Sequence, residues 1–549
     1  MKKICFILLL SNVLGSSLIN FNYDHNLLSI PDPDLDTDFM FEGFPDNSIF
    51  DISSYSGTSI KGVFLGTGRG IGFVYKDIDW KMKKINSNIF PSNSGNPFLK
   101  VYQDKNLVIS SWVSAYFDST ERIYLPKGEG ITWSFDFGET WNFKEQSVDE
   151  NQGTAFIDIN WGGKAIKQRA ITTAVSNVSY DLDIHLLNEE VLHVYTANWA
   201  GSLRRFNLFD LDSSWEIVPM PMDDQSQLTY EMIDDGYEVD SHNSTSGGNE
   251  NHKGFSVKVQ SDTIWVGTSN GVNKGIIKGE YDIDWTHYTK QDGLAGDWIT
   301  GIEIQTFEDR ERVWLVSRTF PYTSHGLTYS DDGGSTWNAI YSTRELGLFG
   351  NHISFNSDSI YYSTSNGLYV NYLNDNSSNV DFWDQFHINS DSDGESLLDD
   401  RTYGSLYFEE QLFVGTSDGL AIYDIDNGLW EILRSFDIKP SGLRDDSEYF
   451  SAYPNPLYID EPHYSTSKQQ ARFYIKDIGS SSMFIEIFDF NMDRVKKINQ
   501  IYSISINEHE AVWNGKNDYG LQCANGVYFC KLSTGDSYYW TKLVIVNSK

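Results

Sequence analysis

A short pattern that returns along the chain constrains the fold more than any other feature of the sequence. It consists of an apolar strand, a turn of the Gly-Thr-Ser-x-Gly type and a second, alternating strand. The clear copies are residues 62–75, 263–277, 359–372 and 411–425, and the looser copies are residues 106–117, 191–206 and 312–330. Units of about 45 residues that hold three or four short strands each are typical of β-propeller blades.

Tryptophans accompany these units. They are Trp80, Trp141, Trp215, Trp285, Trp337, Trp383 and Trp430. Because a blade buries both of its faces against its neighbours, we expect these side chains to pack between blades rather than to stack on a ligand. The sequence predicts an all-β fold with a seven-bladed β-propeller at residues 55–440. An eighth blade, formed by residues 143–190, stays an open alternative.

Two longer segments carry a resemblance to a known repeat. Residues 288–319 and 393–424 contain a turn related to Asp-Gly-Leu, a connecting strand and then an apolar strand that leads into the next turn. They resemble the two-component-regulator type of propeller repeat. The resemblance implies the fold and a role in binding or sensing, and it implies no particular activity.

In the octamers that begin at Ser134 and Ser330, fixed residues recur at every second position, and a tryptophan ends each octamer. Their fixed positions are Ser134, Asp136, Gly138, Thr140 and Trp141 in one copy, and Ser330, Asp332, Gly334, Thr336 and Trp337 in the other. Both resemble the Asp-box, also called the BNR repeat. An aspartate can accept backbone N–H bonds across a turn, and a glycine can take a positive φ. We therefore expect both octamers to be structural turns.

Asp-boxes occur in sialidases, so an enzyme is the rival hypothesis. A sialidase-like site needs an arginine triad, a Tyr and Glu nucleophile pair and an acidic general acid. The Phe-Arg-Ile-Pro signature of that family is absent, and no arginine lies in a matching context. The sequence thus assigns no catalytic residue and favours a protein that is not an enzyme. A glycan-active hydrolase or lyase, sialidase-like and extracellular, stays the alternative.

No cofactor is expected. Asn389, Asp391, Asp393, Gly394 and Asp400 imitate the ligand positions of an EF-hand calcium loop. However, no flanking helices are expected there, and the structural interpretation of a blade connection is favoured. Calcium is the one metal kept as an alternative, and no residue is assigned to a metal site.

Charge and the N-terminal residues indicate where the protein acts. The formal net charge is −36, from 77 acidic and 41 basic side chains, which repels nucleic acid and anionic lipid. Residues 1–17 have a basic start, an apolar stretch and small residues, as in a secretory signal peptide. Residues 18–54 form an N-terminal segment, and no membrane-spanning run follows. We expect a secreted or cell-surface protein with no nucleic-acid partner and no membrane span.

The last block, residues 449–549, changes character. Its alternating strands and regular turns predict a small immunoglobulin-like β-sandwich. The motif residues are Tyr453, Pro454, Asn455, Pro456, Trp513, Gly515, Asn517, Asp518, Gly520, Gly526 and Tyr528. These residues resemble two overlapping families, the type IX secretion C-terminal sorting domain and the immunoglobulin-like domain of the flagellar hook-scaffold protein FlgD. Asn514 departs from the aspartate that usually follows the tryptophan.

This second resemblance implies a partner and a location. The partner is the outer-membrane secretion machinery, and the location is the surface or medium of a diderm bacterium. Cys523 and Cys530 remain after signal cleavage, and one disulfide between them stays open, although their spacing does not favour cross-strand pairing. The favoured function is a non-catalytic binding or adhesion platform for an extracellular glycan or protein.

Overall fold

The computed structural model describes residues 45–547 with gaps. The gaps are residues 58–59, 93, 121–122, 150–155, 171, 176, 234–236, 242–248, 309, 319–324, 374–379, 390, 392–396, 398–400, 435–448, 454, 456, 460–469, 477–482, 506–507 and 536. The predicted signal peptide and residues 18–44 lie outside the described residues.

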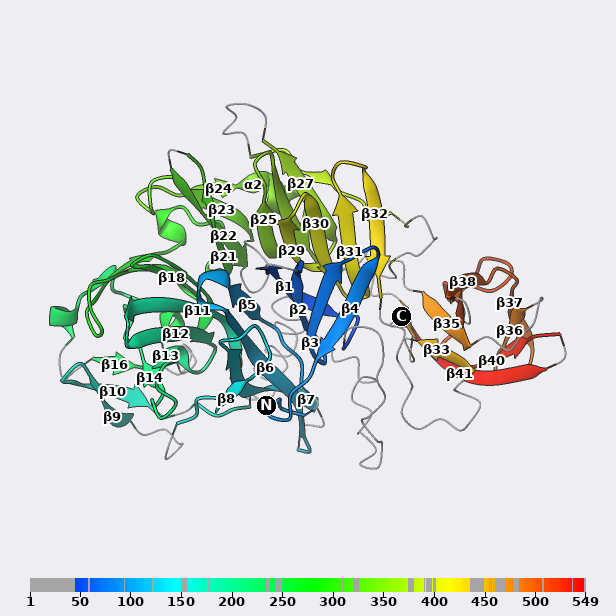
Figure 1. Cartoon of the computed structure of the whole chain (residues 1–549), viewed down its shortest axis with the longest axis horizontal. Helices are drawn as coiled ribbons and strands as arrows, with labels where there is room; N and C mark the ends of the chain where they lie inside the picture. The colour runs from blue at the N-terminus through cyan, green and yellow to red at the C-terminus, as the bar shows by residue number, and fades with distance from the viewer. Residues whose placement is uncertain are drawn as a thin grey trace.

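Seven antiparallel sheets form the first part of the fold, and Figure 1 shows them arranged around a common centre. Blade 1 holds β1 (Ile49–Ser56), β2 (Lys61–Thr67), β3 (Gly70–Lys76) and β4 (Trp80–Ile85). Blade 2 holds β5 (Leu99–Tyr102), β6 (Leu107–Asp118), β7 (Ile123–Ser134) and β8 (Asn142–Glu145). Blade 3 holds β11 (Ser179–Asn188), β12 (Val191–Asn198), β13 (Ser202–Asn207) and β14 (Glu216–Ile217).

The remaining blades repeat this order. Blade 4 holds β17 (Gly254–Gln260), β18 (Thr263–Thr268), β19 (Gly271–Ile277) and β20 (Ile283–Tyr288), with β15 (Gln227–Leu228) added at its edge. Blade 5 holds β21 (Trp298–Thr306), β22 (Glu311–Arg318), β23 (Gly326–Ser330) and β24 (Asn338–Ile340). Blade 6 holds β25 (Gly350–Phe355), β26 (Ser359–Thr364), β27 (Gly367–Tyr372) and β28 (Asp384–Gln385). Blade 7 holds β29 (Thr402–Phe408), β30 (Gln411–Thr416), β31 (Gly419–Asp424) and β32 (Leu429–Leu433).

The ring closes by side-chain packing rather than by sharing a strand. Each blade comes mainly from one continuous segment. The first strand of a blade lies against the first strand of the next at every seam except that between blades 2 and 3, where β11 lies against β6. The seam between blades 7 and 1 is a buried apolar cluster that includes Ile49, Val63, Phe413 and Leu420. The first strand begins at Ile49, before the start at residue 55 that the repeats indicated. The predicted seven-bladed propeller is thus the observed fold.

The recurring Gly-Thr-Ser-x-Gly pattern is a hydrogen-bonded turn between the second and third strands of a blade. In blade 4 the Thr268 hydroxyl donates to the carbonyl of Gly271 at 3.1 Å and accepts from Asn270 N at 3.2 Å. Gly271 has a φ of 101°, which a side chain would strain. The equivalent threonine-to-glycine bonds join Thr67 to Gly70, Thr364 to Gly367 and Thr416 to Gly419.

The region 143–190 does not form an eighth blade. Its described residues include β9 (Phe156–Trp161) and β10 (Lys164–Arg169), which form a hairpin. A third strand, β16 (Glu238–Val239), follows blade 3 in the chain and pairs parallel with β10 through Lys167 and Glu238. Two connections that follow different blades therefore meet in one small sheet. The short helical turns are Gln103–Lys105, Tyr230–Met232, Glu250–His252, Lys290–Asp292 and α2 (Tyr341–Glu345).

The C-terminal part is a sandwich of two sheets and lies to one side of the ring (Figure 1). One sheet has the order β33 (Phe450–Tyr453), β35 (Ala471–Lys476), β39 (Glu508–Trp513) and β38 (Tyr502–Ser505). The other has the order β34 (Leu457–Ile459), β41 (Tyr538–Asn547), β40 (Gly526–Ser533), β36 (Phe484–Phe488) and β37 (Arg494–Ile498). Phe473, Trp513, Ile487 and Leu532 are buried between them. Among the residues described, none of the helices is long and apolar enough to cross a membrane.

Candidate functional site at the centre of the ring

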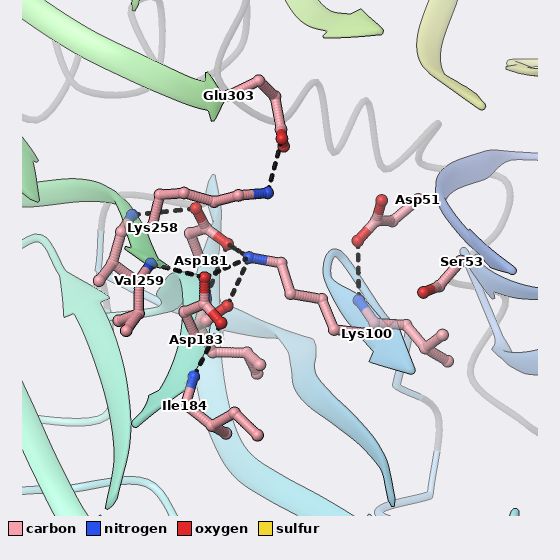
Figure 2. Close-up of polar contacts among 12 residues, drawn as sticks. Asp51, Ser53, Lys100, Asp181, Asp183, Ile184, Lys258, Val259 and Glu303 are labelled. Carbon is pink, nitrogen blue, oxygen red and sulfur yellow. Dashed lines mark hydrogen bonds and ion pairs between the residues drawn. The ribbon is translucent and has the colours of Figure 1, made fainter. Parts of the chain in front are cut away.

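The innermost strands of the blades carry polar side chains at positions where apolar contacts with the next blade would be expected. Asp51 on β1, Lys100 on β5, Asp181 on β11 and Glu303 on β21 lie near one another, with Lys100 directed at Asp181, Asp51 at the backbone of β5 and Glu303 at Lys258 (Figure 2). An innermost strand has a free edge, and its N–H groups need acceptors that no further strand supplies. Side-chain oxygens of one blade supply these acceptors to the next blade.

Blade 1 supplies acceptors to blade 2. Asp51 Oδ2 accepts a hydrogen bond from the backbone N–H of Leu99 at 2.9 Å, and Ser53 Oγ accepts from Val101 N at 2.9 Å. The acceptors and donors alternate along β1 and β5, because side chains on a strand point the same way every second residue. Burial raises the pKa of Asp51 to about 6, although the bond from Leu99 and the nearby charge of His352 act in the opposite direction.

Blade 3 does the same for blade 4. Asp181 Oδ2 accepts from Val257 N at 3.0 Å, and Asp183 Oδ2 accepts from Val259 N at 2.8 Å. Each of these aspartates also accepts with its other oxygen from the backbone of its own strand. Both carboxylates are therefore occupied by β-strand edges and tie two neighbouring blades together.

Lys100 balances these two carboxylates. Its Nζ lies 3.1 Å from Asp181 Oδ1 and 3.9 Å from Asp183 Oδ2, and it donates to the Leu182 carbonyl at 2.6 Å. Burial alone would lower the pKa of Lys100, but the charges of the two aspartates more than offset it, so that the pKa lies above its ordinary value. Lys100 is thus held as a cation and joins blade 2 to blade 3.

The chain of contacts continues around the ring. Lys258 Nζ on β17 lies 2.6 Å from Glu303 Oε2 on β21, and His352 Nε2 on β25 lies 3.7 Å from Glu303 Oε1. Burial would raise the pKa of Glu303, but Lys258 and His352 lower it well below its ordinary value. The hydroxyls of Ser354 on β25 and Ser405 on β29 then lie 2.7 Å apart. Polar contacts therefore pass between successive blades from blade 1 to blade 7.

Solvent reaches one part of this set. The side chains of Lys258, Glu303 and His352 are 25%, 23% and 30% exposed, whereas Asp183 is 6% exposed. These three partly exposed groups can donate hydrogen bonds to a polar ligand or accept them from it, and Lys258 and Glu303 carry opposite charges. Within the described ranges, no group of three or more His, Cys, Asp or Glu side chains is placed to hold a metal ion.

The calcium-like loop precedes the first strand of blade 7. Asp393, Gly394 and Asp400 lie outside the described residues, and Asn389 and Asp391 lie in the connection before β29. The carboxylate of Asp391 accepts from Ile432 N of blade 7 at 3.3 Å, which is a structural contact. Calcium binding at this loop stays a prediction.

The first octamer lies away from the centre, between the third and fourth strands of blade 2. Asp136 Oδ1 accepts from Thr140 N at 2.8 Å, and its Oδ2 accepts from the Thr140 hydroxyl at 2.5 Å. Ser134 Oγ donates to Asp136 at 2.6 Å and accepts from Gly138 N at 2.7 Å. Trp141 Nε1 donates to the Gly138 carbonyl at 3.0 Å. All five fixed residues thus take part in closing one turn.

The second octamer closes an equivalent turn between the third and fourth strands of blade 5, with the aspartate and serine bonds of the first but without its tryptophan bond. Asp332 Oδ1 accepts from Thr336 N at 2.8 Å, and Ser330 Oγ accepts from Gly334 N at 2.8 Å. The φ values of Gly138 and Gly334 are 94° and 93°. Hydrogen bonds from the backbone and hydroxyl of Thr336 lower the pKa of Asp332. Trp337 is buried against the ring of Trp265 from blade 4.

The motif residues of the C-terminal domain gather at one end of the sandwich. Asn455 donates to the Lys542 carbonyl at 2.7 Å and accepts from Val544 N at 2.9 Å, which fixes the start of the domain to β41. Trp513 is buried and donates to the Lys516 carbonyl at 2.8 Å, and its ring meets that of Tyr528.

The remaining motif residues shape the turns at this end. Asn517 Oδ1 accepts from Tyr519 N and Leu521 N, each at 3.0 Å. Asp518 N donates to the Val495 carbonyl at 2.9 Å. Gly515, Gly520 and Gly526 all have positive φ. Tyr453 lies in β33, and Pro454 and Pro456 lie outside the described residues.

The two cysteines of the sandwich are free thiols. Both are buried, and Cys530 stands on β40 within the core. Burial raises the pKa of the Cys530 thiol above its ordinary value. The disulfide that the sequence left open is not formed.

Sequence reasoning missed the central polar set. The signal was present as a polar residue at alternate positions in the first strand of several units, as in Asp181 and Asp183 of β11. It was not decisive, because the acceptor and the donor are far apart in sequence: Asp51 and Leu99 are 48 residues apart, and Asp181 and Val257 are 76 residues apart.

Comparisons with known proteins give likeness in shape at low sequence identity. No family model matches the sequence, and no curated protein matches it. Solved structures that it resembles include PorZ, a surface component of the type IX secretion system of Porphyromonas gingivalis, with 12% identity, coverage of 88% of this chain and 69% of that chain, and a TM-score of 0.35. Another is the extracellular domain of the putative hybrid two-component system BT4673 of B. thetaiotaomicron, with 13% identity, 91% and 81% coverage, and a TM-score of 0.21.

A glycoside hydrolase is also among the similar structures. It is the GH32 beta-fructofuranosidase BmSUC1 of Bombyx mori, with 8% identity, coverage of 72% of this chain and 87% of that chain, and a TM-score of 0.27. The chain's own strand pairings carry the assignment of fold: it is a seven-bladed β-propeller followed by a two-sheet β-sandwich.

Proposed function

We propose that the protein is a secreted or cell-surface propeller that binds an extracellular glycan or protein without catalysis. The observation that carries this proposal is the use made of the central carboxylates. Asp51, Asp181 and Asp183 accept backbone N–H groups of the next blade. A general acid or nucleophile must be able to reach substrate, and these groups are instead engaged in holding the blades together.

The ligand-binding face would be the one that carries the turns between second and third strands and the connections between blades. In antiparallel blades these two kinds of loop lie at the same end. The small sheet of β9, β10 and β16 is built from two such connections. Loops that are held by a rigid scaffold are the usual place for binding residues, which supports this face as the binding surface.

A buried polar cluster fixes this elaborated face to blade 3. Arg204 on β13 donates to Asp149 Oδ1 at 2.7 Å and to the Ser147 hydroxyl at 2.5 Å, and both acceptors lie in the connection after blade 2. Thr172 N also donates to Asp149 Oδ2 at 2.8 Å. A connection held in this way is preorganised, which lowers the entropic cost of binding a partner.

A binding and activity screen with the purified full chain tests the proposal. We expect retention on a glycan array or on an immobilised extracellular protein, with no release of product from the same glycans. Hydrolysis of a glycan substrate would overturn it and favour the glycan-active alternative. Glu303→Gln would then show whether the central set is responsible, because loss of that hydrolysis would assign Glu303 to the chemistry.

Export through the C-terminal domain is a separate part of the proposal. It rests on the resemblance of residues 449–549 to sorting domains and on the predicted signal peptide. In a host with type IX secretion, we expect a reporter that carries residues 449–549 to reach the cell surface or medium. Retention of the fusion in the periplasm would count against this part and leave the binding proposal untouched.

A further inference from the structure

Charged side chains are buried on the outer face of the sheet that contains β35 and β39, where exposure to solvent would be expected. Along β35, Ala471, Phe473 and Ile475 point into the core of the sandwich. Arg472 alternates with them and must point outward. Its side chain is nevertheless only 2% exposed, and Glu510 on the neighbouring strand β39 is 3% exposed. Something outside the sandwich therefore covers this face.

Blade 7 supplies the cover. Asp418 lies in the turn between β30 and β31, and Arg434 directly follows β32. Their side chains are 9% and 1% exposed. Both residues lie at the end of blade 7 that faces the sandwich, since they contact Arg472 and Glu510.

The four side chains form a quartet of alternating charge. Glu510 lies 2.5 Å from Arg472 and 3.3 Å from Arg434, measured between the carboxylate oxygens and the guanidinium nitrogens. Asp418 lies 2.8 Å from Arg434 and 3.5 Å from Arg472 by the same measure. Each acid thus contacts both arginines, and the quartet as a whole is neutral.

Position 418 differs among the four equivalent turns. The residue before the turn glycine is Arg69 in blade 1, Asn270 in blade 4, Asn366 in blade 6 and Asp418 in blade 7. The blade that meets the sandwich therefore carries an acid, and there it is buried. An asparagine would make the same turn bond through its backbone, so the charge itself has no local role in the turn.

We infer that the sandwich and blade 7 form a specific docking interface held by this quartet, so that the two parts stay together without the covalent link between them. Breaking a buried ion pair by removing one partner leaves an uncompensated charge away from water, and this is what makes the interface selective. The docked sandwich is then a fixed part of the folded protein rather than a module on a free tether. This inference concerns the assembly of the two domains and does not depend on any ligand.

The test uses the full chain with a protease recognition site inserted between residues 434 and 449. After cleavage, we expect the two fragments to elute together in size-exclusion chromatography at low micromolar concentration. Separation of the wild-type fragments would overturn the inference. In the Glu510→Gln variant, we expect the dissociation constant of the cleaved fragments to rise about a hundredfold.

The matched control is Glu486→Gln, which removes an exposed contact with Arg494 on the far sheet of the sandwich. It should leave the dissociation constant unchanged. A double-mutant cycle with Asp418→Asn and Arg472→Gln separates docking from general damage, because the two residues belong to different domains. We expect the double variant to weaken association by less than the product of the single effects. Strictly multiplicative effects would overturn direct coupling through the quartet, and circular dichroism before cleavage checks that each variant is folded.

Discussion

Aspartates accept hydrogen bonds from backbone N–H groups in two regions of this propeller, at the centre of the ring and at the outer turns. Asp51 accepts from a strand of the next blade, whereas Asp332 accepts from its own turn four residues away. The pKa of Asp51 is raised to about 6 because it is buried, and the pKa of Asp332 is lowered because hydrogen bonds favour its charged form while solvent remains near.

The difference shows that hydrogen bonding and burial act separately on the pKa of an aspartate. Desolvation disfavours a carboxylate, whereas hydrogen-bond donors favour it. At the turns the donors dominate, and at Asp51 and Asp181 burial dominates, whereas nearby cations overcome burial at Glu303. The central aspartates therefore depend on nearby cations, and the turn aspartates do not.

Removing the central cation should have the largest effect. Lys100→Met leaves Asp181 and Asp183 without their counter-charge, and we expect a loss of about 3–5 kcal/mol in the free energy of unfolding. Urea unfolding of the propeller followed by tryptophan fluorescence measures it. Lys105→Met, which removes a contact with the exposed Asp104, is the control and should change little. Equal effects of the two variants would show that the backbone donors alone hold the central carboxylates.

A change of intermediate size is expected from Asp51→Asn as pH varies. Because the folded pKa of Asp51 is raised from 3.8 to about 6, the wild-type chain should lose stability as pH rises between these values. The variant has no such titration, so its stability relative to wild type should rise by about 2–3 kcal/mol from pH 4 to pH 7. Urea unfolding at several pH values measures the difference. A constant difference would contradict burial as the dominant influence at the centre.

The smallest effects are expected at the outer turns. Asp332→Ala and Asp136→Ala each remove the acceptor of a turn, and we expect a loss of about 1 kcal/mol at neutral pH. Because the folded pKa of each aspartate is lowered, this contribution is present above the unfolded pKa and disappears as pH falls through the folded pKa. Thermal unfolding at neutral and acidic pH measures both. A loss of stability that became larger at acidic pH would contradict the expected difference in pH dependence between these aspartates and Asp51.

Much of the fold was predictable because it is local. In the turn from Thr268 to Gly271 and in the octamer at Ser330, each donor lies within a few residues of its acceptor. The local sequence is therefore enough to predict these hydrogen bonds. The threonine-to-glycine turn recurs in four of the seven blades, and each blade is built mainly from one continuous segment. The central set was not predictable in the same way, because nothing near Asp51 in the sequence indicates that Leu99 N lies against it.

The sequence by itself determined the units: their strands, their turns and the aromatic residues that pack between them. Hydrophobic alternation and turn chemistry act over a few residues and do not depend on the rest of the chain. Only the tertiary structure decided which charges meet. The placement of Lys100 between Asp181 and Asp183, and of Arg434 against Glu510, depends on how separate strands come together. A charge is energetically defined by its neighbours and its distance from water, and folding sets both.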